Sequence, residues 1–140
     1  MANINTGGVV VGGLAAGVII NVSEYILNES VLGDQFAAAM AAHDMPPIDG
    51  STIALFLAYG FALGLVLVWL YAAMRPRLGP GPKTAVIAGV AAWFLAYVTS
   101  MVFIGPTGLF SAQMIVIALI WGLVELVLAA LVGARLYSEA

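Results

Sequence analysis

The sequence contains four hydrophobic segments of about 20 residues or slightly more, at 9–32, 53–74, 84–104 and 112–132. An α-helix of about 20 residues crosses a hydrocarbon core of about 30 Å, so each segment is long enough to span a membrane. The composition agrees, because 64% of the residues are hydrophobic and only 8% are charged, whereas about a quarter of the residues in soluble domains are charged. We therefore expect an all-α integral membrane protein: one domain, residues 1–140, that forms a bundle of four transmembrane helices in contact with the lipid bilayer.

Charged residues are distributed unevenly between the connections. The basic residues all lie in the second connection or at the end of the fourth segment: Arg75, Arg77, Lys83 and Arg135. Because cytoplasmic loops carry an excess of Lys and Arg, this distribution places both termini in the cytoplasm. The loop 33–50, which has three Asp and no basic residue, is then external. Within it, "DQFAAAMAAH" is typical of a short helix on the membrane surface, and a lid is an alternative role for that helix.

A weak internal repeat divides the chain into two halves. The segment "GLAAGVIINVSEY" from Gly13 resembles "GVAAWFLAYVTSM" from Gly89, and "IALFLAYG" from Ile53 resembles "IALIWG" from Ile117. Because each half would hold two helices, both halves would have the same orientation, as in parallel-repeat membrane proteins. The chain would then be two helical hairpins related as a parallel tandem repeat. The alternative is a chance recurrence of Gly, Ala and aliphatic residues, which are common in membrane helices.

Polar residues near the end of the first segment share one helical face. At 100° per residue, Gly13, Gly17, Asn21, Glu24 and Asn28 fall within an arc of about 80°. The two glycines form a small-xxx-small motif, which allows another helix to approach closely. The next three positions would present an amide, a carboxyl and a second amide to that helix. We therefore expect this face to point into the bundle.

The other segments also carry small residues, and the fourth carries a second acid. Glu125 lies near the middle of its segment and on the same helical face as Gly122. The second segment has Gly60 and Gly64 four residues apart. We expect these three glycines, like the two in the first segment, to be positions of close helix packing. Tyr97 in the third segment is a candidate to donate a hydrogen bond to a carboxyl group, although a backbone carbonyl would also satisfy its hydroxyl.

The two acids within hydrophobic segments predict a binding site. A charged acid at the centre of a membrane helix costs on the order of 2.5–3.5 kcal/mol on insertion scales, and no Lys or Arg lies at a matching depth. We therefore expect each acid to be protonated or in contact with water, as in a proton-binding or cation-binding site. The alternatives are that the first acid reaches water at the membrane edge and that the second links helices by a hydrogen bond. The candidate proton, ion or ligand-binding residues are Glu24, Glu125, Asn21, Asn28 and Tyr97.

The sequence lacks the residues that several classes of chemistry need. With no cysteine and a single histidine, His43, the sequence offers no disulfide, no thiolate metal site and no bis-histidine haem site. No nucleophile–base pair, metal-binding cluster or phosphate-binding loop is visible in it. We therefore expect no enzymatic activity, no cofactor and no bound metal. With only four basic residues, the chain is also not expected to bind nucleic acid.

The order of these parts resembles that of short, uncharacterised four-span proteins of bacterial inner membranes. Those proteins have a glycine-rich first helix and then a leucine- or phenylalanine-glycine step with an aromatic residue three positions later, here "VLGDQF" with Gly33 and Phe36. The resemblance implies a location in the bacterial inner (plasma) membrane and brings no particular activity with it.

The chain is also similar to the small multidrug-resistance exchangers, which are short four-span proteins with one essential carboxyl group in the first helix, here Glu24. It differs from them in its long outer loop, in its second acid, Glu125, and in the off-centre position of Glu24. These differences disfavour that family.

Two functions from different classes fit these features. The first is a proton-coupled or ion-coupled carrier of a small solute, which acts as an oligomer through Glu24 and Glu125. The second is a non-catalytic accessory subunit, which packs its small faces against a larger membrane complex and uses its acids for hydrogen bonds between helices. A carrier should gather its polar groups around a cavity that water can enter, whereas a structural subunit should pair each polar group with another.

Overall fold

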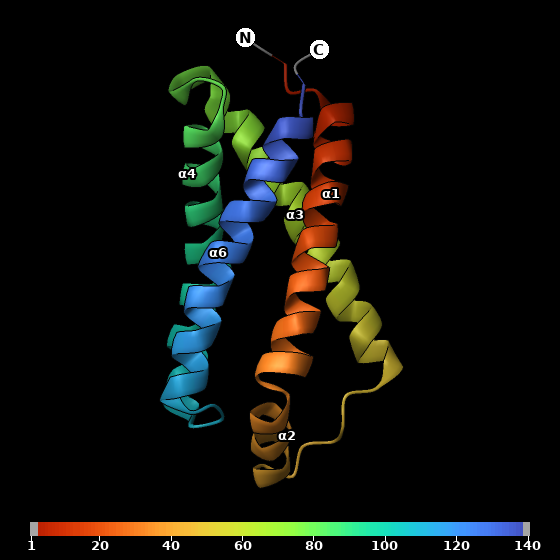
Figure 1. Cartoon of the computed structure of the whole chain (residues 1–140), viewed down its shortest axis with the longest axis vertical. Helices are drawn as coiled ribbons and strands as arrows, with labels where there is room; N and C mark the ends of the chain where they lie inside the picture. Colours follow the sequence, from red (N-terminus) through yellow and green to blue (C-terminus); the bar gives the residue numbers. More distant parts are fainter. Residues whose placement is uncertain (1–2, 139–140) are drawn as a thin grey trace.

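The computed structural model describes residues 3–138, and within these residues all regular secondary structure is helical (Figure 1). The predicted all-α fold is therefore confirmed. The elements in chain order are α1 (Thr6–Tyr25), the π-helical η1 (Ile26–Val31), α2 (Gly33–Ala42), α3 (Gly50–Leu78), α4 (Pro82–Trp93), the π-helical η2 (Phe94–Val98), α5 (Thr99–Ile104), the 3₁₀-helical η3 (Gly105–Thr107) and α6 (Ala112–Leu136).

Within the described residues, four helical segments are long and apolar enough to cross a membrane, as expected of a multi-pass membrane protein. Their mean hydropathy lies between 1.8 and 2.8. The second and fourth segments end four residues later than hydrophobicity alone predicts, at Leu78 against 74 and at Leu136 against 132. Charged residues such as Arg75 and Arg135 extend these helices, because a helix need not stop where its apolar stretch ends. The four segments are Thr6–Val31, Gly50–Leu78, Pro82–Thr107 and Ala112–Leu136.

Side chains cap the N-termini of three of these segments. Asn5, Asp49 and Ser111 each accept a hydrogen bond from a backbone N–H group in the first turn of α1, α3 and α6, respectively. The bond from the Thr52 backbone, followed by one from the Ser51 hydroxyl, lowers the pKa of Asp49 from 3.8 to about 2. This cap therefore stabilises α3 throughout the neutral range, and its contribution is lost only as the pH falls from 3.8 through about 2.

Glycines bring the first two membrane-spanning helices into backbone contact. Helix α1 packs along α3 and along α6, and α4 packs against the other side of α6 (Figure 1). A Cβ atom at Gly64 of α3 would lie 2.4 Å from the carbonyl oxygen of Gly13 and 2.5 Å from the backbone nitrogen of Gly17. Such an approach leaves no room for a side chain at position 64 and is typical of membrane helices that associate through small residues.

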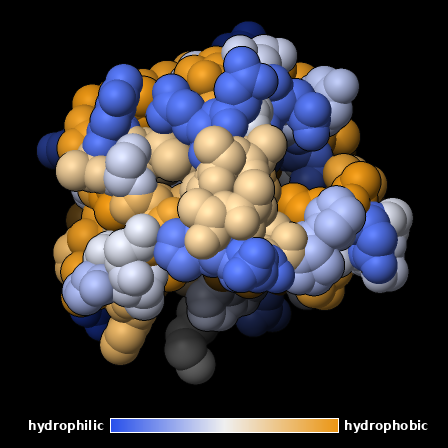
Figure 2. Space-filling model, turned by 90° about the horizontal axis from the view of Figure 1, so that it is seen from below, coloured by the Kyte–Doolittle hydropathy of each residue, from blue (hydrophilic) through white to orange (hydrophobic). Residues whose placement is uncertain are grey.

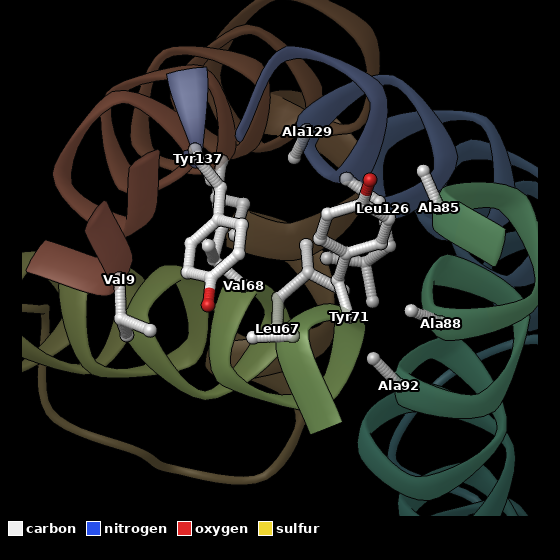
Figure 3. Packing of buried hydrophobic residues seen from close by; sticks show 14 residues of the cluster. Val9, Leu67, Val68, Tyr71, Ala85, Ala88, Ala92, Leu126, Ala129 and Tyr137 are labelled. Carbon is white, nitrogen blue, oxygen red and sulfur yellow. The ribbon is translucent and has the colours of Figure 1, made fainter. Parts of the chain in front are cut away.

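The main hydrophobic core lies in the half of the bundle nearer the termini. Leu67 of α3 and Leu126 of α6 lie within this core and are completely buried (Figure 3). A second and smaller cluster, at the end of the bundle where α2 lies, is built on Leu27, Leu32 and Met114. The larger cluster thus lies toward the termini and the smaller one toward α2.

The two ends of the bundle differ in shape and in charge. At the end opposite the termini, the N-terminal part of α3 diverges from the other helices, and its large side chains, such as Leu55 and Phe56, are exposed (Figure 1). Helix α2 lies at this end, and Figure 2, which looks onto it, shows polar surface around a weakly hydrophobic central area. The four basic residues lie at the other end, in the last turns of α3 and α6 and the first turn of α4.

Candidate functional site

Two acidic side chains from different helices meet at one tyrosine hydroxyl. Glu24 lies one residue before the end of α1, Tyr97 lies in the π-helical turn η2, and Glu125 lies near the middle of α6. The Tyr97 hydroxyl is hydrogen-bonded to Oε1 of Glu24, and the same hydroxyl oxygen lies 2.8 Å from Oε1 of Glu125. Three elements that are far apart in the sequence therefore contribute to one polar network.

The two acids have different surroundings. Glu125 is only 3% exposed, and within residues 3–138 its second carboxyl oxygen, Oε2, has no hydrogen-bond partner. Glu24 is half-buried, and its Oε2 accepts a hydrogen bond of 2.9 Å from the side-chain amide of Asn28. That amide also donates to the backbone carbonyl of Glu24 at 2.8 Å. Within residues 3–138 the basic side chains lie in the last turns of α3 and α6 and the first turn of α4, so no Lys or Arg there adjoins either acid.

Tyr97 lies between the acids in a π-helical turn, against one glycine of α6. A π-helical turn holds one residue more than an α-helical turn, so it rotates the residues that follow by about 100° around the helix axis. One such turn, η1, begins two residues after Glu24, and the other, η2, contains Tyr97. On α6, a Cβ atom at Gly122 would lie 2.5 Å to 2.7 Å from three atoms of the Tyr97 ring. The absence of a side chain at position 122 thus allows this ring to lie against α6.

A cavity of about 160 Å³ adjoins the network. Three of its lining residues are polar, namely Glu24, Asn28 and Tyr97, and the other eight are hydrophobic. Phe36 of α2 and Phe110, which precedes α6, are both on the wall and stack with their ring centroids 5.8 Å apart. The helix for which the sequence suggested a lid role thus supplies part of the cavity wall.

One hydrogen-bonded pair in the site was not predicted from the sequence. The indole N–H of Trp121 donates to the Ser23 hydroxyl at 2.8 Å, which connects α6 to α1 next to Glu24. Trp121 and Glu125 are four residues apart and so lie on one face of α6, a spacing that the sequence already contains. Ser23 carried no such signal, because it lies outside the arc that holds Glu24 and the other polar residues of α1.

Asn21, a predicted ligand-binding residue, lies away from the cavity. Its side-chain amide donates to the backbone carbonyl of Leu57 at 3.2 Å and lies against Gly60, where a Cβ atom would be 2.1 Å from the amide oxygen. Asn21 thus links α1 to α3, whereas Asn28 is hydrogen-bonded to Glu24. The polar residues on this face of α1 therefore contact two different parts of the molecule: Asn21 contacts α3, and Glu24 contacts Tyr97.

The chemistry of the site follows from these groups. Within residues 3–138, no group of three or more His, Cys, Asp or Glu side chains is placed to hold a metal ion. Two carboxyl groups joined by a phenolic hydroxyl can instead hold and exchange protons, and the Glu24 side of this network faces a cavity. Comparisons of the chain with protein-family models, curated proteins and solved structures found no match.

Proposed function

We propose that the protein is a proton-coupled carrier of a small solute and that Glu24 and Glu125 form its proton site. The observation that carries this proposal is the position of the Tyr97 hydroxyl, within hydrogen-bond distance of both carboxyl groups. A phenolic hydroxyl has one hydrogen and donates one bond. The second contact is a full hydrogen bond only if the other carboxyl holds a proton and donates it to the Tyr97 oxygen. The network thus favours one proton on the pair.

The proposed coupling places solute and proton at the same residue. Glu24 and Tyr97 belong both to the network and to the cavity wall, so a solute in the cavity touches groups that hold the proton. A solute that draws Glu24 away from Tyr97 changes the number of protons that the pair binds, which is the thermodynamic requirement for coupling. The larger core near the termini, and the divergence of α3 at the end where α2 lies, support a carrier whose cavity faces one side of the membrane.

Titration of the purified protein tests the proton site. We expect the wild type to take up protons when the pH is lowered, and each of the variants Glu24→Gln and Glu125→Gln to take up fewer, because glutamine does not titrate. Glu29→Gln is the matched control, because it removes an exposed carboxyl group from the adjacent turn and should leave the uptake by Glu24 and Glu125 unchanged. Equal uptake by the wild type and all three variants would remove the basis of the carrier proposal.

A non-catalytic accessory subunit of a larger membrane complex is the second candidate function. The observation that favours it is the bond from Asn21 to the Leu57 carbonyl, since a structural subunit should pair its polar groups in this way. Proton release or uptake by the purified protein on addition of candidate solutes separates the two functions: a carrier should lose it in the Glu24→Gln and Glu125→Gln variants, whereas a structural subunit should show no difference among wild type and variants. Acids that serve only to link helices should tolerate glutamine, which keeps their hydrogen-bonding capacity at nearly the same volume and does not titrate.

The proposal includes a location and an assembly. We place the protein in the bacterial inner membrane with both termini in the cytoplasm, because all of its basic residues lie at the end of the bundle that carries the termini. We also propose that it acts as a homo-oligomer without enzymatic activity. A single chain of four helices with a cavity of about 160 Å³ encloses little space for a solute path.

Cysteine labelling tests the orientation. The chain has no cysteine, so single cysteines introduced at Ser30, His43 and Lys83 can be probed without background. An impermeant maleimide added to intact cells should label positions 30 and 43 and should label position 83 only after the membrane is opened. Labelling at position 83 in intact cells, without labelling at 43, would reverse the proposed orientation.

A further inference from the structure

We infer that a groove between the first turns of α1 and the C-terminal half of α3 binds one acyl chain of an anionic phospholipid, and that the phosphate of this lipid lies at Arg77. The groove is separate from the network of Glu24 and Glu125, so the inference does not depend on the proposed proton site. Three features support it: the groove wall, the position of Arg77 and two polar groups on the wall.

The groove is apolar and opens onto the outer surface of the bundle. It has a volume of about 360 Å³, whereas an apolar cavity of roughly 150 Å³ accommodates benzene. Several of its side chains are half exposed, and in a membrane-spanning helix such side chains face hydrocarbon. The groove is therefore filled by lipid and is long enough for a stretch of one acyl chain. Its lining residues are Thr6, Val9 and Val10 of α1 and Leu65, Val66 and Trp69 of α3.

The wall favours an acyl chain over a helix from a second copy of the protein. Membrane helices approach one another through small residues. Near the groove, the small residues of α1 are already used within the bundle: a Cβ atom at Gly12 would lie 2.5 Å from the carbonyl oxygen of Gly133, and one at Gly13 would lie 2.7 Å from the Cα atom of Leu65. All six lining residues in the described part of the chain are Thr, Val, Leu or Trp. A flexible chain fits between such bulky side chains more readily than a helix does.

Arg77 is positioned to contact the phosphate. It is exposed in the last turn of α3, eight residues after Trp69, which places it about 12 Å farther along the helix and about 80° around its axis. The groove residues of α3 thus lie about 12–18 Å from Arg77 along the helix axis, which matches the hydrocarbon depth of about 15 Å in one leaflet. A lipid whose phosphate bonds to the Arg77 guanidinium therefore has its acyl chain at the depth of the groove.

The other two arginines are placed differently. The guanidinium carbon of Arg75 lies 5.7 Å and 5.2 Å from the ring centroids of two buried tyrosines, so Arg75 points toward the core. Arg135 follows Gly133 by two residues and thus lies about 200° around α6 from a residue that contacts α1. Arg77 is therefore the arginine on the groove side of the bundle.

Two polar groups on the wall can bond to the glycerol region of the lipid. Within residues 3–138, neither the Thr6 hydroxyl nor the indole N–H of Trp69 forms a hydrogen bond, and Trp69 is 51% exposed. Both groups can donate to an ester carbonyl. Tryptophan is enriched near membrane–water interfaces, where its ring contacts hydrocarbon and its N–H group reaches polar atoms. The groove thus combines an apolar wall, polar donors and a cation, in the order in which a phospholipid presents its parts.

Lipid binding by the delipidated, detergent-purified full-length protein tests this inference. Native mass spectrometry would count the molecules of phosphatidylglycerol or phosphatidylcholine bound per chain, with the same acyl chains in both lipids. We expect one phosphatidylglycerol to bind about fivefold more tightly than phosphatidylcholine, since a basic residue near a membrane surface contributes about this factor. Arg77→Gln should remove the preference. Arg135→Gln is the matched control, because it removes the same charge at the same end of the bundle and should keep the preference.

A second pair of variants tests the groove itself. Val66→Trp fills part of the groove and should weaken phosphatidylglycerol binding by about fivefold or more. Val124→Trp is the control, because Val124 lies on α6 outside the groove and is 55% exposed, against 56% for Val66. Phosphatidylglycerol with brominated acyl chains should also quench the fluorescence of the wild type more than that of Trp69→Phe.

Three outcomes would overturn the inference. Equal affinity of the wild type for the two lipids would show that the groove does not select an anionic headgroup. Equal loss of the preference in Arg77→Gln and Arg135→Gln would show a general attraction by the basic end of the bundle. If Val66→Trp dissociates an oligomer and leaves lipid binding unchanged, a second copy occupies the groove. None of these outcomes changes the expected proton uptake, so the proposed function is tested separately.

Discussion

Replacement of Gly64 by alanine is expected to destabilise the bundle strongly, and replacement by leucine is expected to prevent its normal assembly. A Cβ atom at this position would lie 2.4 Å from the carbonyl oxygen of Gly13 and 2.5 Å from the backbone nitrogen of Gly17, and neither backbone atom can move without displacing α1. Overpacking of this kind costs about 1–3 kcal/mol or more for a small added group. The free energy of unfolding of the reconstituted or detergent-solubilised variants in a denaturant titration measures the effect.

Gly50→Ala is the matched control for this prediction. Gly50 belongs to the same helix, and a Cβ atom there would meet nothing within 4 Å. Its substitution should change the free energy of unfolding by no more than about 0.5 kcal/mol. Similar stabilities of the Gly64 and Gly50 variants would show that α1 and α3 are not in backbone contact.

Tyr97→Phe is expected to have the second large effect, since it removes one hydroxyl that serves two acids. Glu125 would lose the partner of Oε1 while Oε2 already has none within residues 3–138, which leaves both oxygens of a buried carboxyl unsatisfied. An unsatisfied buried polar group costs about 1–3 kcal/mol, and more if it is charged. We therefore expect a lower free energy of unfolding together with an altered proton uptake.

Tyr59→Phe provides the control. Tyr59 also lies in a membrane-spanning helix, but its side chain is 58% exposed and lies outside the network and the cavity. Its variant should keep both the stability and the proton uptake of the wild type. If Tyr97→Phe behaves like Tyr59→Phe, the hydroxyl does not connect the two acids, and the proton site would need another explanation.

The glycine substitutions also bear on the interpretation of the small-residue faces. From the sequence we expect such faces both to pack the helices of one bundle and to join the chain to a second copy or to a partner. Gly64 lies against α1, and Gly122 lies against the Tyr97 ring, both within one chain. Substitutions at these two positions therefore test the fold of the monomer. An oligomer would use other surfaces, such as the exposed hydrophobic residues at the N-terminal part of α3.

The sequence alone was sufficient to predict the fold class and the number of membrane-spanning helices. These properties depend on the length and hydropathy of continuous segments, and the cost of placing polar groups in a hydrocarbon phase makes the signal strong. The helix ends were less predictable: α3 and α6 continue past their hydrophobic stretches. The identity of the unusual residues, Glu24 and Glu125, was also evident, because acids within apolar segments stand out without any structural information.

Tertiary structure decided which of these residues meet. The sequence named Tyr97 as a candidate donor to a carboxyl group without indicating which one, and in the structure Tyr97 lies in the π-helical turn η2 and reaches both acids. Asn21 and Glu24 share one face of α1, but Asn21 is hydrogen-bonded to α3, whereas Glu24 is hydrogen-bonded to Tyr97. Periodicity places residues on a helix face and leaves open which helix covers that face, at what crossing angle and at what depth. Those quantities arise from the packing of glycines and rings between helices, and they are what brings Glu24, Tyr97 and Glu125 together beside a cavity.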